Sequence, residues 1–383
     1  MPAGAPTGLD RAAAAVYARG VGGLRRHRAQ RDPGEKRMRA RRLISVVGCH
    51  AEGEIGDVIV GGVLPPSGAT LFEQMECMRR DHDAVRRLLL CEPRGSVARH
   101  VNLLVPAVRP DCQIGAIIME PTEYVPSSGS NLICITTVLL ETGIVAMQEP
   151  ETVVRIEVPG GPVRARATCR DGKCVAVEVE NVPAFVDRLD AALEVEGVGT
   201  VRADVAYGGM FYAIVDATAL GFRVAADEAR ELAILGEKIR RAAREQLGVV
   251  HPENPAIRGV SIVQLNRPFA GVGAVTTNTC IVAPGRSDRS PTGTGTAARM
   301  AVLRARGLMQ VGDTMTHASL IGSTFLGRIL ADARVAGRPA ILPSITGRAW
   351  ITGLHQYLLD PQDPYPQGYL LNDTWGVSGA IAQ

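Results

Sequence analysis

Two short segments of this 383-residue chain share one local design, and they constrain its fold and chemistry more than any other feature. Residues 126–131 read Pro-Ser-Ser-Gly-Ser-Asn, and residues 290–295 read Ser-Pro-Thr-Gly-Thr-Gly. In each, a hydroxyl residue, Ser128 or Thr292, precedes a glycine, and a helix-forming run follows. A glycine suited to end that helix comes 15 positions after the hydroxyl residue in both segments (143 − 128 and 307 − 292).

This pattern predicts two glycine-rich loops that each lead into the N-terminus of a helix. The first turn of a helix leaves backbone N–H groups unpaired, and the helix dipole adds positive potential there. Such ends attract anions and favour the ionised form of a nearby acid. Two facing ends could therefore bind one small carboxylate from both sides. The alternative is two capped helices without a function, since Ser and Thr are common N-caps, but the matched spacing favours a shared site.

Composition limits the class of protein that the chain can be. Its length allows two domains of ordinary size, and 46% apolar residues predict packed cores. Aromatic residues make up only 4%, so these cores must consist of Val, Leu, Ile and Ala. The net charge of +3 is too small to imply a nucleic-acid partner, and no apolar run is long enough to span a bilayer. We therefore expect a cytoplasmic protein with no nucleic-acid or membrane partner, and a homodimer is left open.

The sequence lacks the usual patterns of metal sites and disulfides. None of the eight cysteines forms a CxxC pair, and the seven histidines show no metal-ligand spacing such as HxxxH. Cys169 and Cys174 flank an Arg-Asp-Gly-Lys segment that predicts a hairpin turn, so the two thiols could face each other across it. Reduced thiols fit a cytosolic protein better. We expect no bound metal.

Changes of pattern divide the chain into four parts. Residues 1–40 are rich in Ala, Gly and Arg, which indicates disorder or a mis-annotated start upstream of Met38; a transit peptide or a nucleic-acid arm is the alternative. A first lobe is expected over residues 41–185 and a second over 186–345. Residues 346–383 form a C-terminal segment that could return to the first lobe.

Both halves repeat the same order of elements. Strand-rich segments around one central helix in each half predict an α+β fold of two similar lobes, related by a pseudo-two-fold axis. The helix after the first loop is apolar nearly all round, so it should be buried. Residues 49–56 are expected to form a polar loop. The predicted strands are 43–47, 57–63, 101–105, 113–119, 152–158, 163–168, 175–182, 200–206, 211–216, 261–265, 274–282 and 348–352, and the other predicted helices are 69–91 and 227–247.

Taken as a set, the motifs of this chain resemble the proline racemase superfamily, in its branch of trans-3-hydroxy-L-proline dehydratases and hydroxyproline 2-epimerases. The resemblance implies the two-lobed fold of diaminopimelate epimerase and proline racemase, with a barrel-like sheet around a central helix in each lobe. It also implies that no cofactor is needed and that the active site lies between the lobes. The carrying segments are His50-Ala-Glu-Gly-Glu54, Val60-Gly-Gly-Val63, Glu92-Pro-Arg-Gly95, Ser128-Gly-Ser-Asn131, Tyr207-Gly-Gly-Met-Phe-Tyr212 and, most specific of all, Asp288-Arg-Ser-Pro-Thr-Gly-Thr-Gly295.

The resemblance implies roles for eight residues. In racemases of this family a Cys precedes the glycine in both loops, and Ser128 and Thr292 occupy these two positions here. A carboxyl should contact the ring amine, backbone N–H groups should bind the substrate carboxylate, and two polar side chains should replace a missing His in orienting the substrate. These further residues are, in that order, Asp288; Gly129, Gly293 and Thr294; and Ser130 and Asn131.

Other readings stay open for some of the polar residues. Asp288 could be a turn residue at the entry of a helix. His50, Glu52 and Glu54 could form a metal or acid–base cluster, but a structural loop near the cleft fits better because the family needs no metal. His251 is expected in a turn after the long helix.

The loss of both thiols bears on the choice of reaction. Racemisation needs a competent acid or base on each face of the α-carbon, and a thiol with a pKa of about 8.5 suits this role. A hydroxyl is a far weaker acid, and Thr292 is also stiff at χ1. Dehydration of trans-3-hydroxyproline needs one such group only, because its hydroxyl shares a ring face with the α-hydrogen. Family members with Thr at the second position resemble trans-3-hydroxyproline dehydratases.

We therefore predict a cofactor-free hydro-lyase that converts trans-3-hydroxy-L-proline, a small imino acid, into pyrroline-2-carboxylate. Ser128 is the expected base, and Thr292 is a binding or spectator group across the ring. The alternative within enzymes is an isomerase, either a 4-hydroxyproline 2-epimerase or a proline racemase. The alternative of another class is a catalytically inactive imino-acid-binding homologue.

Overall fold

The computed structural model describes residues 42–371 and 373–375 of the chain, so the expected N-terminal part, 1–40, lies outside the described residues. All of the described residues belong to one compact unit. The expected lobe boundaries at residues 185 and 345 stay predictions. Among the described residues, no helix is both long and apolar enough to cross a membrane.

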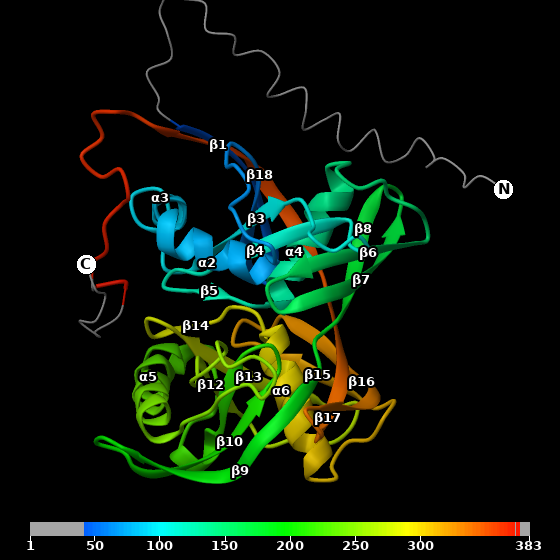
Figure 1. The fold of residues 1–383 in the computed structure, drawn as a ribbon. Helices are drawn as coiled ribbons and strands as arrows, with labels where there is room; N and C mark the ends of the chain where they lie inside the picture. Colours follow the sequence, from blue (N-terminus) through cyan, green and yellow to red (C-terminus); the bar gives the residue numbers. More distant parts are fainter. Residues whose placement is uncertain (1–41, 372, 376–383) are drawn as a thin grey trace, which may run out of the picture. The chain divides into compact units, whose positions relative to one another are not determined.

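The first lobe combines a strand-rich sheet with three helices (Figure 1). Its strands are β1 (Arg42–Ala51), β2 (Glu54–Gly61), β3 (Arg99–Val105), β4 (Ile114–Met119), β5 (Tyr124–Val125), β6 (Glu151–Val158), β7 (Gly161–Arg170), β8 (Lys173–Glu180) and, from the end of the chain, β18 (Ala349–Leu359). Its helices are α2 (Leu71–Asp81), α3 (Ala84–Leu90) and α4 (Gly129–Glu141).

The second lobe repeats this composition. Its strands are β9 (Ala184–Val195), β10 (Gly199–Tyr207), β11 (Phe211–Asp216), β12 (Ile262–Asn266), β13 (Val275–Val282), β14 (Arg286–Ser287), β15 (Thr314–Ala318), β16 (Thr324–Val335) and β17 (Arg338–Gly347). Its helices are α5 (Ala229–Gln246) and α6 (Gly293–Ala305), with short 3-10 turns η1 (Thr218–Leu220) and η2 (Ala226–Glu228).

Strand pairing follows one scheme in both lobes. In the first lobe, β1–β2, β3–β4, β4–β5, β6–β7 and β7–β8 are antiparallel, whereas β2–β3 and β4–β6 are parallel. In the second, β10–β11, β12–β13, β13–β14, β15–β16 and β16–β17 are antiparallel, whereas β11–β12 and β13–β15 are parallel. The same order of pairings in both lobes confirms the expected α+β fold of two pseudo-symmetric, barrel-like lobes.

The chain passes from the first lobe to the second at β9 and returns to the first lobe at β18. β9 follows the last strand of the first lobe but pairs with β10. β18, the last described strand, returns to pair along β1 from Arg42↔Leu359 to Ala51↔Ala349. The lobes also share backbone pairing, because β17 pairs with β8 as well as with β9.

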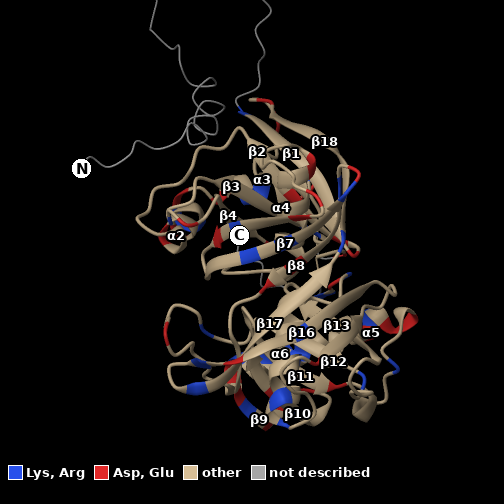
Figure 2. Ribbon diagram, turned by 90° about the vertical axis from the view of Figure 1, so that its right-hand side faces the viewer, with Lys and Arg blue, Asp and Glu red and all other residues tan. Residues whose placement is uncertain are grey.

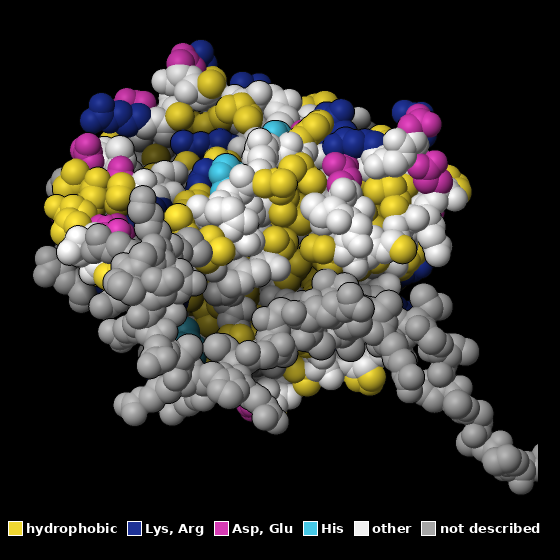
Figure 3. All heavy atoms as spheres, turned by 90° about the horizontal axis from the view of Figure 1, so that it is seen from above, with side chains coloured by type: hydrophobic (Ala, Val, Ile, Leu, Met, Phe, Trp, Pro, Cys, Tyr) yellow, Lys and Arg dark blue, Asp and Glu magenta, His cyan; other side chains and the backbone are white. Residues whose placement is uncertain are grey.

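Helices α4 and α6 lie at the centre of the two lobes (Figure 1). α4 contacts β1, β2, β7, β8 and β18, and α6 contacts β9, β10, β16 and β17. Residues 129–140 contain no charged side chain, and all of them are buried, which agrees with the expected all-round apolar helix. Charged residues of both signs lie on both lobes (Figure 2), and acidic, basic and apolar side chains intermix on the face seen in Figure 3.

Two local predictions are wrong. Residues 49–56 are not a polar loop but the two arms of the β1–β2 hairpin, which turns at Glu52 and Gly53 with φ of 48° and 97°. The helix expected over 69–91 is broken into α2 and α3, and Asp83 lies at the break. Its carboxylate accepts bonds from Arg86 and from the Tyr124 hydroxyl, so tertiary contacts fix the interruption.

Candidate active site

The N-termini of α4 and α6 meet at Gly129 and Gly293. A Cβ added to either glycine would lie 2.9 Å from the Cα of the other, so the two backbones are in contact and no side chain fits between them. This brings together the two helix ends that the sequence pattern predicted to face each other. The unpaired N–H groups of both first turns therefore contribute positive potential to one location.

Ser128 and Thr292 are the N-cap residues of these helices, and each is only 6% exposed. Neither side chain caps its own helix, so both hydroxyls are available for other contacts. Ser128 has ordinary extended backbone angles. Thr292 has φ 62° and ψ 108°, a left-handed conformation that is strained for a β-branched residue. Strain of this kind persists where surrounding structure enforces it, commonly at functional sites.

A buried carboxylate holds Thr292. The Thr292 hydroxyl donates to Asp288 Oδ2 at 2.6 Å. Asp288 Oδ1 accepts from the backbone N–H and the hydroxyl of Ser290 at 2.9 and 3.1 Å. Ser290 Oγ in turn accepts from the Thr292 N–H at 3.1 Å. The segment from Asp288 to Thr292 is thus a closed turn in which one carboxylate fixes the position of the hydroxyl.

An amide holds Ser128. Asn131 Nδ2 donates to Ser128 Oγ at 2.9 Å and lies 3.2 Å from Nδ1 of His100. The orientation of this amide follows from Asn102, whose Nδ2 donates both to the Asp57 carbonyl at 3.0 Å and to Asn131 Oδ1 at 2.9 Å. Ser128 therefore accepts a hydrogen bond from a neutral amide, and its own proton remains free to donate.

Beside Asp288 lies a buried ion pair that joins the two lobes. Arg286 Nη2, from β14, donates to Glu54 Oε1, from β2, at 2.6 Å, and it lies 2.6 Å from His100 Nε2. Glu54 Oε2 accepts from the backbone N–H of Arg289 at 2.8 Å. Glu54 thereby binds Arg286 and Arg289, which lie before and after Asp288 in the chain.

These contacts set the ionisation of the cluster. Burial would raise the pKa of Glu54, but the Arg286 guanidinium outweighs it and holds that pKa at about 2. Burial, and then the negative charge of Glu54, raise the pKa of Asp288 to about 8. Burial lowers the pKa of His100 to about 4. At neutral pH, Glu54 is thus ionised and His100 is neutral, whereas Asp288 is mostly protonated and becomes ionised as the pH rises through about 8.

Two cysteines next to the central elements are buried thiols with raised pKa values. Cys134 on α4 and Cys280 on β13 are fully buried, and burial raises the pKa of both thiols. All eight cysteines are free, including the register partners Cys169 and Cys174. Over the described part of the chain there is no group of three or more His, Cys, Asp or Glu residues suited to a metal ion.

The remaining predicted residues surround the same point. Ser130 is buried in the first turn of α4. Thr294 Oγ1 is bonded to the Tyr212 hydroxyl at 2.6 Å, which fixes this side chain against β11. The sequence interpretation missed Arg286, His100 and Asn102 as site neighbours, whereas it expected the segment of Glu54 to lie near the cleft.

Other residues singled out in the sequence lie in structural contacts. Glu52 accepts from Arg348, and the His50 ring stacks on Trp350 with centroids 5.2 Å apart. His251 accepts from the N–H groups of residues 253 and 254 in a turn, and its ring packs against Tyr207. These contacts separate His50 and Glu52 from Glu54, so the three do not form one cluster.

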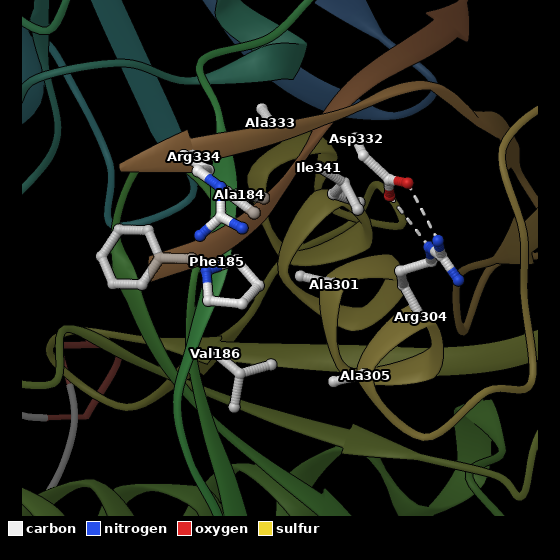
Figure 4. A pocket seen from close by; sticks show the side chains of 12 residues that line it. Ala184, Phe185, Val186, Ala301, Arg304, Ala305, Asp332, Ala333, Arg334 and Ile341 are labelled. Atoms are coloured by element: carbon white, nitrogen blue, oxygen red, sulfur yellow. Dashed lines mark hydrogen bonds and ion pairs between the residues drawn. The ribbon is translucent and has the colours of Figure 1, made fainter. Parts of the chain in front are cut away.

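Two cavities lie near the helices. One of about 170 Å³ is lined by α2, by residues 123–126 just before Ser128, and by Met210. The other, of about 520 Å³, lies among β9, β16, β17 and the later turns of α6, where Ala301, Ala305 and Arg304 line it (Figure 4). Ala301 is eight positions after Gly293, or roughly 12 Å along the helix, so this second cavity is remote from the meeting point of the helix ends.

The fold thus brings two helix N-termini together, each with a hydroxyl residue at its N-cap. The chain matches the family model described as proline racemase over residues 46–370, and it belongs to the proline racemase family. The racemases and epimerases of this family are isomerases.

Solved structures agree with this assignment. The chain is similar to a hydroxyproline epimerase from Agrobacterium vitis with bound trans-4-hydroxy-L-proline, at 42% identity and a TM-score of 0.85 over 89% of this chain and 99% of that one. It is also similar to a probable proline racemase from Agrobacterium radiobacter K84 with bound carbonate, at 45% identity and a TM-score of 0.84 over 87% and 98%. A PhzF-family protein from Bacillus anthracis, at 11% identity and a TM-score of 0.51 over 83% of this chain and 99% of that one, shares the fold.

Proposed function

We propose that the protein is a cofactor-independent dehydratase that eliminates water from trans-3-hydroxy-L-proline to give pyrroline-2-carboxylate. The observation that carries this proposal is that the two hydroxyls at the helix ends have different hydrogen-bond partners. Thr292 is bonded to the carboxylate of Asp288, whereas Ser128 is bonded to the amide of Asn131. A substrate held between them would then meet, on one face only, a hydroxyl that is hydrogen-bonded to a carboxylate base.

This asymmetry suits elimination better than epimerisation. Inverting the α-carbon requires proton removal on one face and proton delivery on the other, so both groups must be competent acid–base catalysts. Elimination from the trans-3-hydroxy isomer requires one, because the α-hydrogen and the leaving hydroxyl share a ring face. This enzyme has one hydroxyl bonded to a carboxylate and no thiol at either position, so it meets the requirement of elimination for a single acid–base group.

The helix ends supply the other part of the mechanism. Loss of the α-proton places negative charge on the substrate carboxylate, which becomes enolate-like. Backbone N–H groups of the Gly129 and Gly293 turns are fixed in position, so they stabilise that charge without reorganisation. The burial of the site, with both hydroxyl residues 6% exposed, excludes water and strengthens these interactions.

A second function is favoured by a specific observation and needs the same test. The relative at 42% identity is described as a hydroxyproline epimerase. A 4-hydroxyproline 2-epimerase would use Ser128 and Thr292 as the two acid–base groups. This alternative predicts interconversion of trans-4-hydroxy-L-proline and its 2-epimer, without an unsaturated product.

The experiment incubates purified protein separately with trans-3-hydroxy-L-proline, trans-4-hydroxy-L-proline and L-proline in D2O. Proton NMR follows the pyrroline product, and chiral chromatography follows the epimers. The proposal expects pyrroline from the first substrate and no epimer from the others. Epimer formation without pyrroline would replace the dehydratase by the epimerase. Binding of an imino acid without turnover or α-hydrogen exchange would indicate an inactive binding homologue.

A further inference from the structure

We propose that Thr292 and Asp288 act as one hydroxyl–carboxylate base, in which the Thr292 oxygen takes the α-proton while its own proton passes to Asp288. Ser128 then serves as a hydrogen-bond donor on the opposite side. The inference rests on the proposed function, because it assigns the groups that act on the same imino acid. It exchanges the roles that the sequence analysis predicted, with Ser128 as the base and Thr292 as a binding or spectator group.

The first argument is the direction of the hydrogen bonds. A hydroxyl becomes a base only when a stronger base accepts its proton. Thr292 already donates to Asp288 Oδ2 at 2.6 Å, the short distance typical of a hydroxyl on a charged oxygen. Ser128 Oγ instead accepts from Asn131 Nδ2 at 2.9 Å. An amide N–H cannot accept a proton, so the bond at Ser128 leaves that hydroxyl a donor.

The second argument is that the Asn131 amide cannot flip to exchange its Oδ1 and Nδ2. Reversing Asn131 would place its Nδ2 against the Nδ2 of Asn102, which is 2.9 Å from the present Oδ1. Asn102 cannot reverse with it, because its Nδ2 also donates to the Asp57 carbonyl at 3.0 Å. All three residues are buried, at 3% exposure or less, so no solvent can satisfy a reversed pair. Contacts within the first lobe therefore fix the Asn131 amide as the hydrogen-bond donor to Ser128.

The third argument is that the second lobe constrains the hydroxyl–carboxylate pair. Thr292 is held at φ 62°, and Asn278 Nδ2 donates to the carbonyl of Pro291, the residue before it, at 2.9 Å. Thr296 Oγ1 donates to the Thr292 carbonyl at 2.9 Å. Asp288 is fixed by two bonds from Ser290. A strained residue held from several sides indicates that its position matters more than its local stability.

The charge around Asp288 fits a base that works near neutral pH. A base is most effective when its pKa lies near the operating pH. Burial and the charge of Glu54 raise the pKa of Asp288 to about 8, while the Arg286 guanidinium opposes them. The titratable and charged groups that face Asp288 are Glu54 on β2, Glu120 after β4, Tyr212 on β11, Cys280 on β13 and Arg286 on β14.

The step balances without another reactant. The Cα–H bond breaks, its proton goes to Thr292 Oγ1, and the proton of that hydroxyl goes to Asp288. The electron pair first delocalises into the substrate carboxylate and then forms the Cα–Cβ double bond as the Cβ–OH bond breaks on the same ring face. The departing hydroxide takes a proton from Thr292, which recovers one from Asp288. Water and the unsaturated ring leave, and the enzyme returns to its starting protonation state.

The test follows α-hydrogen exchange in D2O, which reports proton removal whether the product is a pyrroline or an epimer. We expect Thr292→Val and Asp288→Asn each to lower exchange and elimination by about 10²–10⁴-fold. Thr292→Ser should restore most of the rate, because it keeps the hydroxyl. Ser128→Ala should lose less than about tenfold, as for one hydrogen-bond donor.

A pH profile separates a chemical role from a structural one. In wild type and in Ser128→Ala, kcat/KM should rise with pH and level off above an apparent pKa of about 8. Asp288→Asn should lose this rise. Full exchange in Thr292→Val, or exchange abolished by Ser128→Ala alone, would refute the pairing. Exchange without pyrroline would refute only the dehydratase proposal, and wild-type protein that exchanges no hydroxyproline would refute both.

Discussion

Replacing Gly129 by alanine tests the contact on which the site depends. The new Cβ would lie 2.9 Å from Gly293 Cα, 3.4 Å from its carbonyl carbon and 3.6 Å from the Thr294 nitrogen. Non-bonded carbon atoms prefer about 3.5–4.0 Å, so the two helix ends must separate by roughly 0.6–1.1 Å. The obstacle is backbone on both sides, so no side-chain rotation can relieve it.

The expected size follows from this displacement. Overpacking a tight interior contact costs about 1–3 kcal/mol, which exceeds the gain of up to about 1 kcal/mol from alanine over glycine in a helix. A shift of about 1 Å at a reacting centre can cost about 100-fold in rate. We therefore expect Gly129→Ala to lower the free energy of unfolding, measured by denaturant titration, and kcat/KM by about 100-fold.

A matched control is available in the same chain. Gly248 is exposed, and nothing lies within 4 Å of an added Cβ, so Gly248→Ala should change neither quantity. If Gly129→Ala behaves like Gly248→Ala in both assays, the N-termini of α4 and α6 do not touch, and the reasoning about a shared anion site is refuted.

Three further expectations concern the residues around the contact. The double variant Ser128→Cys/Thr292→Cys should gain epimerisation of hydroxyproline, since thiols supply an acid–base group on each face; no epimer by chiral chromatography would contradict this. Glu54→Gln should destabilise the fold by about 3–5 kcal/mol in denaturant titration, because Arg286 loses its buried partner, whereas Asp111→Asn at an exposed pair should not. The folded pKa of His100 is about 4 and that of His317 about 3, both below the ordinary 6.5, so the unfolded chain binds more protons below pH 6.5. The contribution of these two imidazoles to the unfolding free energy should therefore fall as the pH drops from about 6.5 towards 4, opposite in sign to that of Asp288. The difference in unfolding free energy between wild type and His100→Gln should change over this range, and a constant difference would argue against a buried neutral imidazole at His100.

Local patterns in the sequence were enough to find the two central helices and their loops. The helix after Ser128 is uncharged through residue 140, and the hydroxyl–glycine motif marks where it begins, at Gly129. Amphipathic spacing likewise located α5. These features depend on residues a few positions apart, so periodicity and capping chemistry report them directly.

Strands with mixed exposure and long-range contacts were not predictable in this way. β16 places charged residues such as Asp332 among partly buried ones, and β9 is exposed along its middle, so neither shows a clean apolar alternation. The bond from Arg286 to Glu54 spans 232 positions. The raised pKa of Asp288 and the donor role of Asn131 arise only when such distant residues are brought together.

The pairing of β18 with β1 has a consequence for synthesis of the chain. During translation β1 is made before the whole second lobe, whereas the strand that covers its edge is made after that lobe. The second lobe, whose strands β9–β17 are consecutive, can complete its sheet while the first still exposes an unpaired edge. Truncation before residue 349 should therefore damage the first lobe, although every residue removed lies at the opposite end of the chain.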